Sequence, residues 1–150
     1  MCIEGTPSKI YSLSPDKAIT AWREWDLSKT NLADGSTREE LVPAGTGMPV
    51  RPRAWRGCIA KAHKRPTGKR ASDVGLHAKT RPTRFNPLGS VAGKVRLFGR
   101  VVEHRRGGVV TGYLAEYAEI VGLSVKHSTC HDAATRVPEV ARLYGVKVLA

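Results

Sequence analysis

The residues best able to bind a metal ion are a cysteine and two histidines in one stretch of the chain, Cys58, His63 and His77. A structural zinc site needs four Cys or His ligands held close together. This stretch supplies at most three, and a second cluster at 127–131 could donate only if folding brought the two together. We therefore expect no metal and no cofactor, with zinc as the alternative, and Cys58 as a small buried apolar residue.

Residues that could support catalysis do not form a recognisable set. Cys130 and His131 are neighbours in sequence, but a catalytic pair needs spatial placement and a third orienting group. Glu103 and His104 would point to opposite faces of a strand. The Gly68–Arg70 stretch has Arg where a phosphate-binding loop needs Ser or Thr. We predict that the protein is not an enzyme.

The positive charge of the chain lies in its middle. Between Leu41 and Val102 there are fourteen Lys or Arg and a single acid, Asp73, which gives this window a net charge of +13. Residues 1–40 carry −2 and residues 103–150 carry +1. A basic block between nearly neutral ends favours a polyanion as the partner.

The basic block also contains two aromatic residues, Trp55 and Phe85. Arginine can bind a phosphate through two N–H groups, and an aromatic ring can stack on an unpaired base. We predict stacking by Trp55 and Phe85. The predicted phosphate contacts are Arg51, Arg53, Arg56, Lys64, Arg65, Lys69, Arg70, Arg81 and Arg84.

Two functions fit this pattern. The leading hypothesis is a small basic accessory or regulatory protein that binds nucleic acid, DNA or RNA. The alternative is a module that docks on an acidic host or virion protein through the same arginines, including a structural component of a virion. The block has no amphipathic helix, so we do not expect it to bind a membrane surface.

The compartment can also be predicted. The chain has no apolar run of about 18 residues that could span a membrane. Its N-terminus shows no secretory signal, and three widely spaced cysteines do not make a disulfide framework. We expect a cytoplasmic protein, in the host cytoplasm if the chain is viral.

The expected elements surround the basic block. We predict a strand over residues 18–27, with a helix as the alternative, because Trp22 and Trp25 would share one face of a helix. Asp34-Gly35 is a turn that could be the tip of a hairpin. Residues 94–104 alternate well, and Arg105–Gly108 is a strong hairpin turn. One face of that strand carries Lys94, Arg96, Phe98, Arg100 and Val102.

The return strand begins near Val109, but its second half is ambiguous because apolar residues recur there every three positions. Near the C-terminus, Asp132 can cap a helix over 133–144, and Gly145 can end it. Residues 146–149 would form a short last strand.

These elements predict a single α+β domain over residues 1–150. A small, curved, antiparallel sheet would pack against the C-terminal helix. Residues 43–90 would form a long basic excursion, which is either loop or disorder unless a ligand or tertiary contacts order it.

Several short motifs resemble a loose family of small, mostly uncharacterised actinobacterial and actinobacteriophage proteins. They are the paired Trp22 and Trp25, the Cys/His stretch, the hairpin residues Gly99–His104 with Ala115–Ala118, and the closing Tyr144–Val146. The resemblance implies an origin in an actinobacterium or its phage more than an activity. Ser72 and Val74 stand where the family pattern has cysteines, so any family metal site has lost half of its ligands here.

Overall fold

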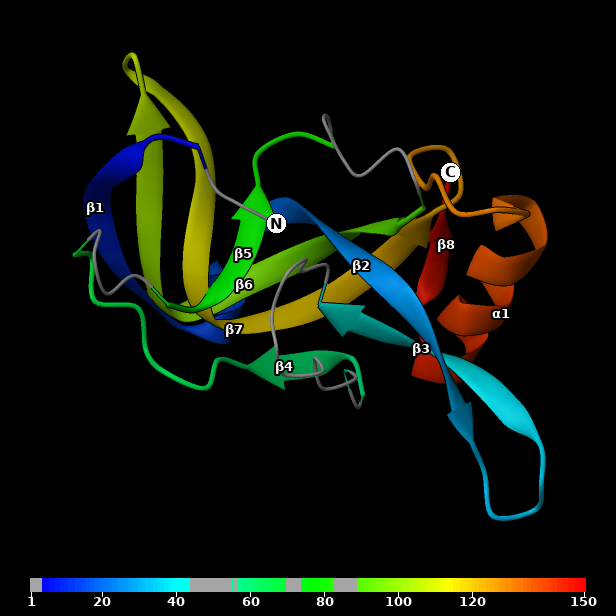
Figure 1. The fold of residues 1–150 in the computed structure, drawn as a ribbon. Helices are drawn as coiled ribbons and strands as arrows, with labels where there is room; N and C mark the ends of the chain where they lie inside the picture. The colour runs from blue at the N-terminus through cyan, green and yellow to red at the C-terminus, as the bar shows by residue number, and fades with distance from the viewer. Residues whose placement is uncertain (1–3, 44–54, 56, 70–73, 83–88) are drawn as a thin grey trace.

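The structure is a computed structural model that describes residues 4–43, 55, 57–69, 74–82 and 89–150. The described residues form eight strands, one α-helix and one turn of 3-10 helix (Figure 1). In chain order these are β1 (Thr6–Leu13), η1 (Pro15–Lys17), β2 (Ile19–Asn31), β3 (Thr37–Pro43), β4 (Ile59–Lys61), β5 (Leu76–Lys79), β6 (Val91–Arg106), β7 (Val109–Ser124), α1 (Ala133–Tyr144) and β8 (Lys147–Leu149).

All the strands belong to one sheet, in the order β1-β6-β2-β5-β7-β4, with β3 beside β2 and β8 beside β7. The pairings β6–β2, β2–β5, β5–β7 and β7–β6 close a ring, so the sheet curls around its own core. β8 runs parallel to β7, while the other pairs are antiparallel. The predicted α+β class with a small antiparallel sheet is therefore wrong: the fold is mainly β, with a large mixed sheet.

The β6–β7 hairpin is the centre of the fold, and each of its strands is 16 residues long. Its turn is Gly107-Gly108, with φ of 58° and 78°, which is the backbone that a tight hairpin turn requires and that glycine adopts without strain. The ambiguous second half of β7 is a strand. Its period of three does not mark one face, because Leu114 and Ile120 are buried whereas Tyr117 lies opposite Phe98 and is partly exposed.

The strand predicted near Trp22 is confirmed and extends to Asn31, beyond the expected range. Together with β3 it forms an arm that projects from the sheet, at the lower right of Figure 1. The turn at Asp34-Gly35 is the tip of this arm, closed by the N–H of Leu32 donating to the carbonyl of Ser36.

Two parts of the expected basic excursion are strands of the sheet. β4 and β5 both pair with β7, and Trp55 reaches the core. β1 lies in a segment where we predict no strand, and it pairs with the half of β6 that is nearer the hairpin turn. These strands are short or lie at a sheet edge, and their sequences lack the alternation of a strand with one buried face.

The C-terminal helix and last strand lie where the sequence places them. α1 buries Val137, Val140, Ala141 and Tyr144, and it includes Pro138. The backbone turns at Gly145, whose φ is 66°, as expected for a helix end. Asp132 occupies the cap position, but its side chain makes no capping hydrogen bond. No helix in the described part of the chain is long and apolar enough to cross a membrane.

Candidate nucleic-acid interface

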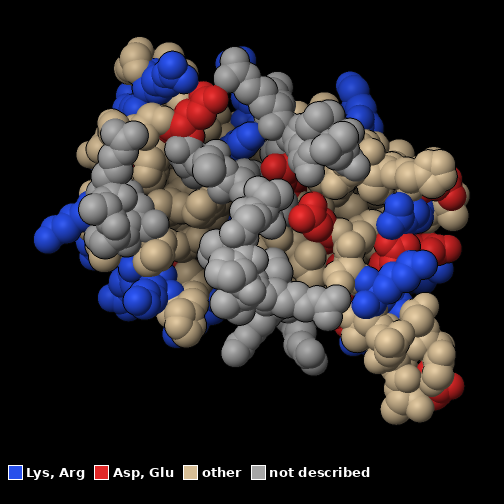
Figure 2. All heavy atoms as spheres, viewed as in Figure 1, with Lys and Arg blue, Asp and Glu red and all other residues tan. Residues whose placement is uncertain are grey.

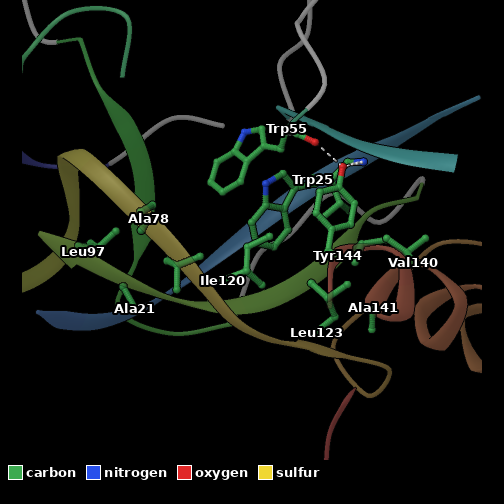
Figure 3. Close-up of a cluster of buried hydrophobic side chains, with 14 of the residues drawn as sticks. Ala21, Trp25, Trp55, Ala78, Leu97, Ile120, Leu123, Val140, Ala141 and Tyr144 are labelled. Carbon is green, nitrogen blue, oxygen red and sulfur yellow. Dashed lines mark hydrogen bonds between the residues drawn. The ribbon is translucent and has the colours of Figure 1, made fainter. Parts of the chain in front are cut away.

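Trp55 does not lie on the surface. It is 6% exposed, and its ring meets Trp25 edge to face with centroids 5.2 Å apart (Figure 3). Its backbone N–H donates to the carbonyl of Leu41, and its carbonyl accepts a hydrogen bond from the Tyr144 hydroxyl. The predicted stacking role of Trp55 is therefore wrong, because no base can reach a ring enclosed in the core.

The other predicted contacts divide into two groups. Lys64, Arg65, Lys69 and Arg81 are exposed in the structure, as phosphate contacts must be. The remaining predicted residues lie outside the described part of the chain: Arg51, Arg53, Arg56, Arg70, Arg84 and Phe85.

A different aromatic pair lies on the solvent side of the sheet. Phe98 on β6 and Tyr117 on β7 are cross-strand partners, and both are partly exposed. Their rings are stacked, with centroids 5.2 Å apart and planes within 4° of parallel. Parallel rings on a sheet surface are a common platform on which proteins stack the bases of single strands.

Basic side chains surround this pair. Lys61 on β4 lies opposite Tyr117 in the sheet, and its ammonium is 5.6 Å from the centre of the Tyr117 ring. Arg96 is two residues before Phe98, so it shares the same face, and its guanidinium pairs with Glu119 at 2.9 Å.

The face continues onto β2. Lys94 lies opposite Trp22, with its ammonium 5.3 Å from the centre of the Trp22 ring. The rings of Trp22 and His127 are nearly perpendicular, with centroids 5.2 Å apart. We call this surface the outer face. It is formed by Trp22, Lys61, Lys94, Arg96, Phe98 and Tyr117.

The basic character extends beyond the outer face. Figure 2 shows Lys and Arg side chains around the end of the molecule formed by β1 and the β6–β7 hairpin. Arg65, on the loop that follows β4, reaches the β6–β7 pair, where its Nε donates to Glu116 at 3.2 Å. The structure thus brings one of the predicted phosphate contacts beside the Phe98–Tyr117 pair.

Sequence reasoning missed Tyr117 and treated Phe98 only as part of a strand. The signal for Phe98 was present, because it is the one aromatic residue in a row of basic residues on one strand face. Tyr117 could not be assigned to that face from the sequence, because the period of three made its strand look helical.

One basic residue is buried. Arg23 is 6% exposed, and its guanidinium lies 4.9 Å from the centre of the Trp55 ring and donates to the carbonyl of His77 at 2.7 Å. Burial lowers the pKa of Arg23 to about 10, and the nearby Glu24 acts in the opposite direction. Arg23 therefore contacts Trp55 in the core and is not available at the surface.

The candidate metal ligands are not brought together. The carbonyl of Cys58 accepts a hydrogen bond from Ile120, whereas His77 pairs with Leu114 further along β7. Those two positions are about 20 Å apart along a strand. His63 is exposed, and the described residues contain no group of three His, Cys, Asp or Glu able to hold a metal ion.

Comparisons with known proteins do not identify the chain. No protein-family model matches it, and neither does any curated protein or any solved structure. The resemblance to small actinobacterial and phage proteins therefore stays a prediction.

Proposed function

We propose that the protein binds single-stranded nucleic acid on its outer face. The observation that supports this most is the stacked, partly exposed Phe98–Tyr117 pair, which lies among lysines and arginines on the solvent side of the sheet. A base would extend the stack, and the cations would neutralise phosphates on either side of it. Unpaired bases are required, because a duplex hides its base faces.

The chain's net charge of +12 favours this function. Phosphate contacts provide affinity with little sequence preference, and they make binding depend steeply on salt. Stacking is likewise tolerant of sequence, because every base has a flat face. We therefore propose an accessory or regulatory protein that distinguishes single strands from duplexes and has little preference for base sequence.

The test is binding of labelled single-stranded DNA, single-stranded RNA and duplex DNA between about 50 and 300 mM salt, a range in which phosphate contacts are strongly weakened. We expect single strands to bind more tightly than the duplex, with log affinity falling linearly against log salt. Phe98→Leu should weaken single-strand binding about 5- to 150-fold, the range measured for loss of one stacked base.

A matched pair of variants separates the outer face from overall charge. Lys61→Gln with Lys94→Gln removes two cations from the outer face, whereas Arg142→Gln with Lys147→Gln removes two exposed cations from α1 and β8. The first pair should weaken binding much more than the second. Equal losses, or no binding at low salt, would contradict the proposal, and the second result would favour an acidic protein as the partner.

A further inference from the structure

A pocket lies beside the Phe98–Tyr117 pair, where β6 bends. It has a volume of about 370 Å³, within the range of small-ligand sites. β1 forms one wall, and the loop after β4 forms another. We call it the bend pocket; its lining residues are Ser12, Leu13, Ser14, Arg65, Gly99, Arg100 and Glu116.

The bend exists because β6 has one extra residue here. The strand register shifts between Phe98 and Val101, and Gly99 has a φ of 73°. A Cβ on Gly99 would lie 2.7 Å from Oε1 of Glu116 and 2.7 Å from Cδ2 of Tyr117. The pocket and the aromatic pair are thus built by the same backbone feature.

Glu116 orders the two arginines of the pocket. Its Oε1 accepts the backbone N–H of Arg100 at 3.1 Å, and its Oε2 accepts the Nε of Arg65 at 3.2 Å. The backbone N–H of Arg100 first, and then Arg65 and Lys61, hold the pKa of Glu116 below its ordinary value against the opposing effect of burial. Glu116 is therefore ionised and occupied, and it does not present a free carboxylate to a ligand.

The arginines keep unused donors. The Arg100 guanidinium donates to the carbonyl of Thr67 at 3.4 Å, a long contact, and its buried Nε has no hydrogen-bond partner among the described residues. Arg65 uses its Nε for Glu116, and its side chain is 65% exposed. With Lys61 close by, the three cations and Glu116 give this region a local charge of +2.

We infer that the bend pocket binds the terminal phosphate of a nucleic-acid strand whose end base stacks beside it. This inference rests on the proposed function. A terminal phosphate carries a charge of about −1.5 to −2 near pH 7, which matches the pocket better than the single charge of an internal phosphodiester. Paired guanidinium groups suit phosphate oxygens, and the exposed Ser12 can add a hydroxyl donor.

The position of the pocket supports this reading. Arg100 is two residues after Phe98, and Glu116 comes directly before Tyr117. The pocket also reaches the edge of the stacked pair, because Oε1 of Glu116 and Cδ2 of Tyr117 both lie 2.7 Å from the position that a Cβ on Gly99 would take. A base on the rings would place its own end phosphate within reach of the pocket.

The test uses one oligonucleotide sequence with a 5′ phosphate, with a 3′ phosphate or with hydroxyl ends. We expect one phosphorylated form to bind about tenfold more tightly than the hydroxyl form, as a charge-assisted hydrogen-bond pair predicts. Which end gives the gain identifies the direction of the strand. Arg100→Gln should abolish the difference in affinity between the phosphorylated and the hydroxyl strand, and Glu116 should stay in place because the backbone N–H that holds it remains.

The failures are distinguishable. If neither phosphate improves binding while Phe98→Leu still weakens it, the inference about the pocket is wrong and the proposed function stands. If no strand binds in any form, both are wrong. Arg142→Gln serves as the matched control, because it removes one exposed arginine far from the pocket in the fold.

Discussion

The guanidinium of Arg23 lies over the ring of Trp55, 4.9 Å from its centre, inside the sheet. The contacts of Trp55 with Arg23, Trp25 and Tyr144 hold this residue in the core. A residue that the sequence places in a basic loop is thus a structural anchor. Replacing Trp55 should lower the free energy of unfolding more than it weakens binding of nucleic acid.

Trp55→Ala should lower the free energy of unfolding by about 3–5 kcal/mol, the usual cost of truncating a buried Trp or Phe. Trp22→Ala is the matched control, since Trp22 is only partly buried, and it should cost less. Urea unfolding followed by circular dichroism measures both. A loss under about 1 kcal/mol for Trp55→Ala would mean that the ring is not a core residue.

Arg23 should make stability depend on alkaline pH. Its pKa is about 10 in the folded state, well below the ordinary value of an arginine, because burial disfavours the charged form. Between these values the unfolded chain binds more protons, so the contribution of Arg23 to stability rises as pH increases above about 10.

The measurement compares wild type with Arg23→Met in urea at pH 7, 9 and 10.5. The variant keeps an unbranched side chain of similar character to the arginine stem and cannot titrate. Wild type should gain stability relative to the variant only at the highest pH, while lysines and tyrosines that titrate in both proteins cancel. A constant difference would show that Arg23 stays charged at no cost.

The sequence predicts the elements that local residue patterns define, and it does not predict the elements that depend on pairing with a distant strand. The β6–β7 hairpin, its Gly107-Gly108 turn and α1 were predictable, because local alternation, turn chemistry and helical spacing define them. β4 and β5 were not, because each is three or four residues long and is held by its pairing with β7. The predicted α+β class was wrong for the same reason, because the sheet gains strands that the sequence does not indicate.

The candidate site was predictable only in part. The basic block and the exposure of Arg65 follow from composition, but the pairing of Phe98 with Tyr117 is set by the register between two long strands. The burial of Trp55 depends on Arg23 and Tyr144, which are distant in sequence. No local pattern distinguishes a Trp that stacks on bases from one that stacks on a buried arginine.

Glu103 should support stability at neutral pH and lose that effect in acid. It is 4% exposed and accepts hydrogen bonds from Ser8, Tyr11 and Arg105. Burial raises the pKa of Glu103, but the bonds from Arg105, Ser8 and Tyr11 outweigh burial and hold it below its ordinary value of 4.5. Its stabilising effect is therefore complete above that value and is lost as pH falls below it.

Glu103→Gln should lower the free energy of unfolding by about 1–3 kcal/mol at pH 7, with the gap to wild type closing as pH falls below that ordinary value. Urea unfolding between pH 7 and 2.5 measures the gap. Glu139→Gln on the exposed side of α1 is the control and should change little. A gap that does not depend on pH would contradict this role of the carboxylate.

Gly99→Ala should destabilise the bend and weaken strand binding together. The new Cβ would lie too close to Glu116 and Tyr117. Alanine would also have to adopt the left-handed backbone of Gly99, which costs about 1–3 kcal/mol. Gly35→Ala is the control, because Gly35 also has a positive φ but has no atom within 4 Å of its Cβ position. It should lose less stability and no affinity, whereas equal effects at the two sites would mean that the bend does not shape the site.

The most direct test of the outer face is a titration of the labelled protein with a short single strand, followed by NMR. We predict that adding the oligonucleotide changes the chemical shifts of the Phe98 and Tyr117 rings and of Lys61 and Lys94. The chemical shifts of the buried Trp25 should not change. Shifts confined to residues 44–54 and 83–88 with the outer face unchanged, or no shifts at all, would contradict the claim that the sheet surface binds nucleic acid.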